Sequence, residues 1–231
     1  GKTFVPDSWD DPQAFCQTNV LGTVNALEFC RKNRIPMTYV SAYVYGHPDS
    51  LPIGENSAIR PSNPYALTKR LAEEAWEFYA SAYDLPVTTI RPFNVYGIGQ
   101  ADHFLIPAII SQALDDKEEI VVKDLAPKRD YIYLEDLVTA LVATMSTQDG
   151  YRVYNIGSGV SLSVREVIDV IQGVARTHKI IVCDNAARTN ELMDVVADIS
   201  KAGNELGWQP GFSFHAGIEN IMRSEREKRH V

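Results

Sequence analysis

The sequence predicts an α/β fold, with a parallel sheet covered by helices on both faces and a smaller mixed lobe in the C-terminal part. Helical and strand patterns alternate along the first part of the chain, and parallel strands need such helical crossovers between them. The strand candidates are short apolar runs rich in β-branched residues, which is typical of strands covered on both faces. After Gly97 the elements become shorter and more varied, which indicates the second lobe.

The first helix is expected to begin at Pro12. Asp11 is placed to cap it, and a proline is tolerated in the first turn because its missing N–H has no helical partner there. Residues at helical spacing predict an apolar face made of Cys16, Val20, Val24 and Leu27.

A strand, a helix and a second strand follow. The run 37–42 predicts a buried strand, which leads into a loop that contains Gly and Pro and extends from residue 46 to 61. The next helix is expected over 63–83, with Pro64 in its first turn. The run 87–92 predicts the second strand, which ends at a proline.

The second part contains shorter elements. We expect helices over 105–114, 136–145 and 164–174, and a short one between Asp198 and Gly207. Strands are expected over 119–123, 152–156 and 179–183. Ser163, with Glu166 three residues later, fits a capping box at the start of the third of these helices. The charged tail 224–230 is expected to fray.

Composition excludes several classes of protein. The chain has 231 residues and a formal net charge of −8, and this acidic balance argues against a nucleic-acid-binding surface. No apolar run approaches the roughly 20 residues of a membrane-spanning helix, and no apolar signal segment opens the sequence. Three cysteines without a CxxC pair predict reduced thiols in a cytoplasmic protein, with neither a disulfide framework nor a zinc site.

Tyr65 and Lys69 are the strongest chemical signal. Residues four apart share one face of a helix, so the phenol and the ammonium group are expected to point the same way. A nearby cation favours the phenolate and is expected to lower the tyrosine pKa from its usual value of about 10. Such a tyrosine can exchange a proton with a substrate hydroxyl or carbonyl group. The spacing alone is common on helices, so it needs support from neighbouring residues.

Ser41 supplies that support. It ends the strand expected over 37–42, and the carboxyl ends of parallel strands form the ligand crevice of a doubly wound sheet. Its hydroxyl could hold a substrate oxygen against Tyr65. The alternative role for Ser41 is a hydroxyl that satisfies a turn at the strand end.

Several sequence blocks together resemble the extended short-chain dehydrogenase/reductase family, and in particular its NAD-dependent nucleotide-sugar epimerases and dehydratases. The three main blocks are VSAYVYG at 40–46, NPYALTK at 63–69 and RPFNVYG at 91–97. Further matches are NVLGT at 19–23, RDYIY at 129–133, YNIG at 154–157, ADISKA at 197–202 and LGW at 206–208. These blocks extend over most of the chain in the family's order, and their joint occurrence is highly specific.

The resemblance implies roles for individual residues. Tyr65 would be the catalytic acid and base, and Lys69 would hold the nicotinamide ribose and tune the phenol. Ser41 would orient the reacting hydroxyl, and Asn19 would complete the catalytic set. The residues implied in nucleotide-sugar binding are Asn94, Arg129 and Arg188. Guanidinium groups suit phosphate oxygens, although each arginine could instead form a surface ion pair.

Two branches of the family are disfavoured by the residues directly after Ser41. The dehydratase branch has an acid pair at these positions, whereas this chain has Ala42 and Tyr43. The decarboxylase branch expects a glutamate near the same strand end. An epimerase and a 4-keto reductase both remain, because each needs only the Ser, Tyr and Lys side chains and a nicotinamide cofactor, NAD with NADP as the alternative.

The larger departure concerns the N-terminal side. The family begins with a strand, a GxxGxxG turn and a helix that together hold the cofactor pyrophosphate, and this sequence has no such motif. The segment lacking would be about 80 residues long, close to one mononucleotide-binding half. We therefore expect a truncated Rossmann-like sheet in 1–97, a substrate lobe in 98–231 interleaved with it, and an exposed sheet edge.

Three functions stay open. The first is an NAD-dependent nucleotide-sugar epimerase, the second an NADPH-dependent nucleotide 4-keto-6-deoxysugar reductase, and the third a non-catalytic chain that binds only the sugar nucleotide. The family's usual dimer packs the helices that carry Asn19 and Tyr65, so a homodimer is expected. No metal site is predicted, because the histidines lack ligand spacing, and no GxSxG motif supports a serine hydrolase.

Overall fold

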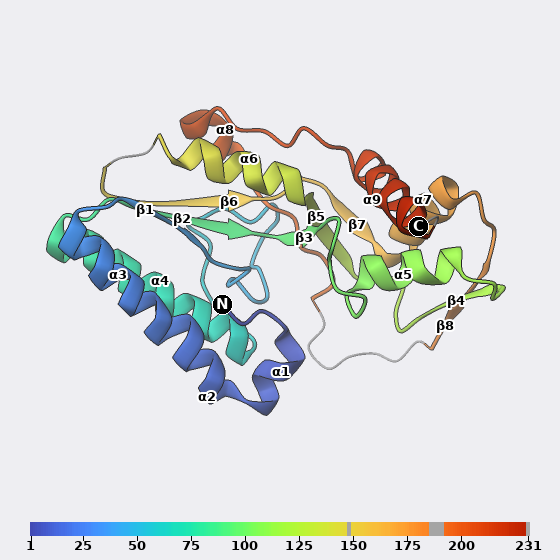
Figure 1. The fold of residues 1–231 in the computed structure, drawn as a ribbon, viewed down its shortest axis with the longest axis horizontal. Helices are drawn as coiled ribbons and strands as arrows, with labels where there is room; N and C mark the ends of the chain where they lie inside the picture. Colours follow the sequence, from blue (N-terminus) through green and yellow to red (C-terminus); the bar gives the residue numbers. More distant parts are fainter. Residues whose placement is uncertain (147–148, 185–191, 230–231) are drawn as a thin grey trace.

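A parallel three-stranded sheet lies at the centre of the N-terminal part of the computed structural model, which describes residues 1–146, 149–184 and 192–229 (Figure 1). Its strands, in spatial order, are β1 (Met37–Val40), β2 (Val87–Pro92) and β6 (Tyr151–Ile156). All residues of β2 are buried, as the apolar strand pattern predicts. β2 pairs with both neighbours in parallel, so the three strands end on the same side of the sheet.

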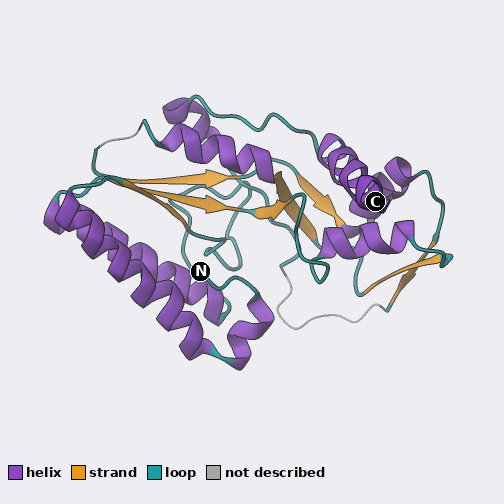
Figure 2. Ribbon diagram, viewed as in Figure 1, coloured by secondary structure: helices purple, strands orange, loops and turns teal. Residues whose placement is uncertain are grey.

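Helices cover both faces of this sheet, which confirms the predicted α/β layers (Figure 2). One face carries α3 (Gly22–Asn33) and α4 (Pro64–Tyr83), and the other carries α6 (Leu134–Thr144) and α8 (Ser200–Leu206). Leu27 and Trp76 lie in the core on the first side, while Leu137 and Trp208 lie in the core on the second. Side chains that alternate along β2 fill both cores.

The helix predicted from Pro12 is present, but an additional helix precedes it and the register after it differs. The N-terminal helical region consists of α1 (Val5–Asp10), α2 (Pro12–Phe15), η1 (Cys16–Leu21) and α3. Asp11 caps α2, with its carboxylate accepting a hydrogen bond of 3.0 Å from the Ala14 amide. The expected apolar face is wrong at Cys16, which is exposed, whereas Phe15 and Asn19 are buried. The π-helical turn explains this shift, because its hydrogen bonds skip one more residue than those of an α-helix.

The second lobe is mixed, as expected. One sheet has the order β3 (Asn94–Tyr96), β5 (Lys128–Tyr133) and β7 (Ser161–Ser163), with β7 antiparallel to β5. A parallel pair joins β4 (Glu119–Val122) to β8 (Ile180–Cys183). The remaining helices are α5 (Leu105–Leu114), α7 (Val164–Ala175) and α9 (Phe214–Arg229). The predicted capping box of α7 is present.

The helix α9 corrects the expectation of a frayed tail. It continues to Arg229 because Ile218, Ile221 and Met222 are buried in the core of the second lobe and anchor the helix. Helix-forming charged residues then extend it.

The two parts of the chain interleave. β6 returns to the first sheet after the second lobe has begun, and α6 and α8 pack on that sheet as well. The expected boundary at residues 97 and 98 lies between β3 and α5, and it stays a proposal because later elements cross it.

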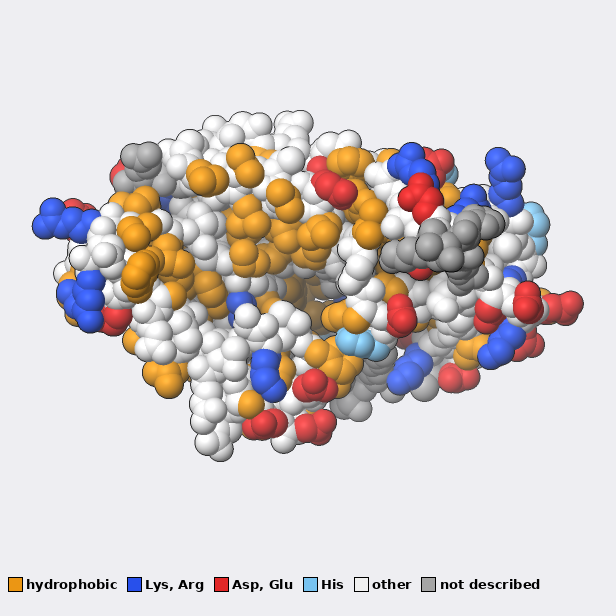
Figure 3. Space-filling view, in the orientation of Figure 1, with side chains coloured by type: hydrophobic (Ala, Val, Ile, Leu, Met, Phe, Trp, Pro, Cys, Tyr) orange, Lys and Arg blue, Asp and Glu red, His pale blue; other side chains and the backbone are white. Residues whose placement is uncertain are grey.

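One edge of the first sheet is exposed. Among the described strands, β1 pairs only with β2. Hydrophobic side chains gather across the middle of the face drawn in Figure 3. Exposed apolar residues near this edge include Val40 on β1 and Val138 and Val142 on α6, with exposed fractions of 38%, 49% and 61%. Within the described residues we find no helix suited to crossing a membrane.

Candidate active site

Helix α4 positions Tyr65 and Lys69 on one face. Asn63 caps the helix, its side chain accepting a 2.8 Å hydrogen bond from the Ala66 amide, and Pro64 follows at the first helical position. Tyr65 therefore lies in the first turn and Lys69 in the second. The Tyr65 ring contacts Phe15 of α2 edge to face, with 6.3 Å between the ring centroids.

Lys69 links α4 to the end of β1. Its Nζ atom donates a 2.6 Å hydrogen bond to the carbonyl oxygen of Val40 and lies 4.4 Å from the centre of the Tyr39 ring. Burial lowers the pKa of Lys69 to about 8, although the negative charge of Glu73 opposes this shift. The ammonium group is thus held directly beside the residue that precedes Ser41.

Ser41 is buried with an unsatisfied hydroxyl. Its amide donates to the carbonyl oxygen of Ile90 at 2.8 Å, which extends the β1–β2 ladder by one residue. The side chain belongs to a residue only 3% exposed, and within the described part of the chain nothing hydrogen-bonds its Oγ atom. Leaving a buried hydroxyl unpaired costs about 1–3 kcal/mol. The alternative role in a turn is not what the described contacts provide.

The pKa of Tyr65 moves in the direction opposite to the expected one. Burial raises it to about 12. The expected lowering relied on the Lys69 ammonium group, which here is bonded to the Val40 carbonyl and stacked on Tyr39. In this structure Tyr65 therefore keeps its proton at neutral pH.

Asn19 forms its hydrogen bonds with the catalytic helix α4 and the N-terminal segment, and none is described between Asn19 and Ser41. Asn19 lies in η1 and is buried, and its Nδ2 atom donates to the Oγ1 atom of Thr68 and to the carbonyl oxygen of Lys2, both at 3.1 Å. Its Oδ1 atom accepts a 2.9 Å bond from the Lys2 amide. Thr68 in turn donates to the carbonyl oxygen of Tyr65 at 2.8 Å. Asn19 thus holds the N-terminal segment against the turn of α4 that lies between Tyr65 and Lys69.

Two of the three expected substrate residues lie on neighbouring strands. Asn94 begins β3, and its Nδ2 atom donates to the Asp130 carbonyl oxygen of β5 at 3.1 Å. Arg129 on β5 donates to the carbonyl oxygen of Leu192 at 2.6 Å. Arg188 lies outside the described residues.

The loop after Ser41 connects the two groups. Tyr43 packs edge to face on Phe93, which directly precedes Asn94, with ring centroids 5.5 Å apart. Burial raises the pKa of Tyr43, and the positive charge of Arg129 opposes that rise. The ring contact of Tyr43 with Phe93 connects the loop that follows Ser41 to the segment that begins β3 at Asn94.

A buried network beneath α4 was not anticipated from the sequence. Glu73 on α4 and Arg91 on β2 form an ion pair of 2.7 Å. Arg91 also donates to the phenol oxygen of Tyr45 at 2.9 Å, and that phenol donates to Asn155 on β6 at 2.6 Å. Spacing could have pointed to Glu73, because it stands one turn beyond Lys69 on the same helix face.

Asp130 is a second unanticipated residue. Its buried carboxylate accepts hydrogen bonds from the backbone amides of Ser158, Gly159 and Ala197, at 2.6, 3.0 and 3.0 Å. Burial raises the pKa of Asp130, although these bonds oppose the rise. A Cβ atom on Gly157 would come within 2.7 Å of the carboxylate, so only glycine fits there.

That carboxylate also decides whether Gly157-Ser158-Gly159 could cradle a phosphate. The two amides that could bind an anion already bind Asp130, so the turn is occupied by an internal anion. The residues that the resemblance assigns to the ribose and nicotinamide end of a dinucleotide, Tyr65 and Lys69, lie one turn apart on α4. A glycine-rich turn that fits the pyrophosphate is not found in the described residues.

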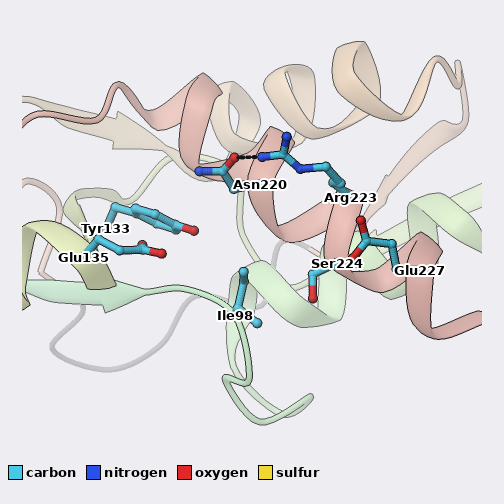
Figure 4. A pocket seen from close by; sticks show the side chains of 7 residues that line it. All are labelled: Ile98, Tyr133, Glu135, Asn220, Arg223, Ser224 and Glu227. Carbon is cyan, nitrogen blue, oxygen red and sulfur yellow. Dashed lines mark hydrogen bonds between the residues drawn. The ribbon is translucent and has the colours of Figure 1, made fainter.

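A cavity of about 320 Å³ lies away from the candidate catalytic residues (Figure 4). It lies between the start of α6 and α9, and it includes Tyr133, Glu135, Asn220 and Arg223. Figure 4 shows the Arg223 side chain bonded to Asn220. None of the expected catalytic or substrate residues lines it. We place the candidate site at Ser41, Tyr65 and Lys69 because of the Lys69–Val40 hydrogen bond and the unpaired Ser41 hydroxyl.

Relatives that are named as enzymes match almost the whole chain. A putative UDP-glucose 4-epimerase of Methanocaldococcus jannaschii is 31% identical, over 94% of this chain and 72% of the relative. The GDP-6-deoxy-D-mannose reductase of Pseudomonas aeruginosa is 30% identical, over 96% of this chain and 77% of the relative. The solved structure of RMD from P. aeruginosa, complexed with NADPH, superposes with a TM-score of 0.91 at 31% identity, covering 99% of this chain and 80% of that one.

A family profile matches as well. The profile described as GDP-mannose 4,6 dehydratase covers residues 1–221, which include every block that carried the resemblance. The relatives are enzymes that act on nucleotide sugars by name, and they include both an epimerase and a reductase. The chain belongs to the GDP-mannose 4,6 dehydratase family, within the extended short-chain dehydrogenases/reductases.

Proposed function

We propose that the protein is an NAD-dependent nucleotide-sugar epimerase that inverts carbon C4 of the sugar by oxidation and re-reduction. The observation that carries this proposal is the bond from Lys69 Nζ to the Val40 carbonyl, directly before Ser41. The bond ties Lys69 to the residue before Ser41, and the buried hydroxyl of Ser41 has no hydrogen-bond partner in the described chain. The Ser41 hydroxyl and the Tyr65 phenol are then both available to one substrate oxygen at the strand ends.

In the proposed reaction, deprotonated Tyr65 takes the proton of the C4 hydroxyl, while Ser41 holds the same oxygen by a hydrogen bond. When bound, NAD would supply the hydride chemistry by which C4 is oxidised and then re-reduced on its opposite face. Tyr65 then gives the proton back to the oxygen, so no net oxidation takes place. Lys69 stabilises the phenolate through its charge and would hold the nicotinamide ribose.

The sugar nucleotide would lie between the two lobes. Asn94 and Arg129 are the described residues that we assign to it, together with Arg188. Arginine side chains suit the diphosphate because their planar guanidinium groups bond two oxygens at once. The nucleotide base and the sugar stay open between the UDP- and GDP-linked substrates in the names of the relatives.

The second candidate is an NADPH-dependent nucleotide 4-keto-6-deoxysugar reductase. A pKa near 12 leaves Tyr65 protonated at neutral pH, which suits a residue that donates a proton to a carbonyl oxygen during reduction. The similarity to the GDP-6-deoxy-D-mannose reductase and to the NADPH-bound structure supports it. A 4,6-dehydratase is disfavoured despite the family's name, because Ala42 and Tyr43 stand where that branch has its acid pair.

The third candidate is a chain that binds the sugar nucleotide without catalysis. It is supported by the glycine turn at 157–159, whose amides bind Asp130 and are not available to a pyrophosphate.

We further propose that the chain divides into domains 1–97 and 98–231 and forms a homodimer. We also propose a cytoplasmic location, suggested by cysteines that form no disulfide within the described residues.

Calorimetric titration and product analysis separate the three candidates. An epimerase binds NAD at micromolar concentration and interconverts UDP-glucose and UDP-galactose with no net change in absorbance at 340 nm. A reductase instead consumes one NADPH for each 4-keto-6-deoxy sugar nucleotide reduced. Sugar-nucleotide binding without detectable binding of NAD, NADH or NADPH would support the third candidate and contradict the first two.

A further inference from the structure

A buried ion pair lies one helical turn beyond Lys69. The carboxylate of Glu73 is inaccessible to solvent and Arg91 is only 3% exposed. The Arg91 Nε atom donates to Glu73 at 3.0 Å and its Nη2 atom donates at 2.7 Å, so the guanidinium group grips the carboxylate with two donors. Because Glu73 belongs to α4 and Arg91 to β2, the pair joins the catalytic helix to the central strand of the sheet.

The same guanidinium group holds the loop after Ser41. Its Nη1 atom donates to the Tyr45 phenol at 2.9 Å and to the Glu55 carbonyl oxygen at 3.2 Å. Tyr45 is fully buried, four residues after Ser41, and its hydroxyl donates to Asn155 on β6. One side chain therefore fixes the helix that carries Lys69 and the loop that continues from Ser41.

The charge of the pair acts on Lys69. Glu73 is the charged side chain that raises the pKa of Lys69 against the larger effect of burial. Arg91 places a compensating positive charge on the far side of that carboxylate. Arg70, also on α4, is a second cation on Glu73, at 3.4 Å, and its charge stays in place in each of the variants below. Tyr65 on α4 and Tyr39 on β1 are the tyrosines near Lys69, and both are neutral at pH 7, since burial raises the pKa of each. Coulombic effects are strong here because the groups are buried.

We infer that Glu73 and Arg91 are positioning residues of this site, a buried ion pair that fixes the place and the electrostatic environment of Lys69. The inference rests on the proposed function only for its catalytic meaning. The ion pair touches neither substrate nor cofactor and acts through Lys69. A buried pair is weak support for stability as such, since a well-packed neutral pair is often equally stable.

The test is a pH titration of the Lys69 amine in the full chain, monitored by NMR of the ¹⁵N- and ¹³C-labelled Nζ–Cε group. The Lys69 resonance is assigned by its loss in Lys69→Arg. Glu73→Gln removes the negative charge and leaves Arg91, so the pKa of Lys69 is expected to fall by about one unit or more. Glu73→Gln combined with Arg91→Met removes both charges, so the pKa is expected to return most of the way to the wild-type value.

Tyr45→Phe is the matched control. It removes the hydrogen bonds of the Tyr45 hydroxyl to Arg91 and Asn155 but leaves the ion pair and the bond from Arg91 to the Glu55 carbonyl oxygen intact. The Lys69 pKa should therefore stay within about 0.3 units of the wild-type value, a small fraction of the shift that a neighbouring charge produces. If Glu73→Gln does not fold, Arg91→Met compared with the double variant answers the same question, because it differs from it only by the Glu73 carboxylate.

A purely structural role predicts a different result. The melting temperature would then fall in the single variants while the Lys69 titration stayed unchanged, and that outcome overturns the inference. The titration needs no turnover. A shifted Lys69 pKa in a chain that converts no nucleotide sugar would therefore uphold the inference and reject the proposed function, and the reverse pattern would do the opposite.

Discussion

Tyr65 and Lys69 lie one turn apart on α4, and burial moves their pKa values in opposite directions. It raises that of Tyr65 to about 12 and lowers that of Lys69 to about 8. Both shifts favour the neutral form, as expected when charged groups lose water. The sequence spacing predicted a protonated Lys69 that lowers the pKa of Tyr65, whereas burial favours the neutral form of both side chains. A bound substrate and cofactor would therefore have to supply part of the charge that activates Tyr65.

Replacement of Tyr65 tests its role as acid and base. Tyr65→Phe is expected to lower kcat about 10²- to 10⁴-fold in the epimerase or reductase assay, because general acid–base catalysis contributes about that much. The matched control is Tyr79→Phe on the same helix. The Tyr79 hydroxyl donates a 2.8 Å hydrogen bond to Glu28 and lies away from the candidate site. Equal activity of wild type and Tyr65→Phe would assign the proton transfer to another group.

Lys69 also makes stability depend on pH. The unfolded chain keeps this lysine protonated up to its usual pKa of 10.5, whereas the folded chain releases the proton near 8. Unfolding therefore takes up a proton in this window, and the free energy of unfolding rises with pH. Between pH 8 and 10 the wild type should gain about 2 kcal/mol relative to Lys69→Met. Urea unfolding of both proteins measures this, and parallel pH profiles would contradict it.

At the scale of elements, the N-cap of α4 is what places Tyr65 in a first turn. Asn63→Ala is expected to cost about 1 kcal/mol of stability and to speed hydrogen exchange of the Ala66 amide. Ser163→Ala removes the equivalent cap of α7. It should cost a similar amount while leaving Ala66 protected. Asn63→Asp keeps the acceptor and should restore both properties, and a slow Ala66 amide in Asn63→Ala would show that the cap is dispensable.

Elements with a clear period could be predicted from the sequence, and those set by long-range packing could not. The strands β1 and β2 and the helix α4 carry their own apolar patterns and caps. β5 begins with charged residues, so its sequence does not indicate a buried strand. The burial of Asp130 is explained only by the amides of residues 158 and 159, which donate to its carboxylate in the folded chain. The π-turn η1 has no sequence signature, so the register of the first helical region was mispredicted. Motif blocks identified Ser41, Tyr65 and Lys69. Helix spacing could have pointed to Glu73, but its pairing with Arg91 became visible only through their contact across 18 positions.

At the scale of the molecule, we propose that the candidate site lies between the two lobes. Tyr43 packs on Phe93, and the positive charge of Arg129 opposes the rise that burial causes in the pKa of Tyr43. The loop after Ser41 therefore links the catalytic helix to the strands of the second lobe. The sheet that carries the site also has exposed apolar surfaces on its two helical layers. They lie on α3 and α4 on one side and on α6 on the other, and the two surfaces predict different assemblies.

The α3–α4 surface is the better candidate for a dimer interface. Phe29, Leu67 and Phe78 are exposed by 62%, 49% and 58%, and a paired copy would bury them in a four-helix contact. Phe78→Glu is therefore expected to convert a dimer into a monomer in sedimentation velocity, with the melting temperature little changed, because the side chain lies at the surface. Val142→Glu on α6, whose side chain is 61% exposed, is the matched control and should leave the dimer intact. Loss of the dimer in Val142→Glu alone would move the interface to the opposite face of the sheet, and a monomeric wild type would refute the proposed homodimer.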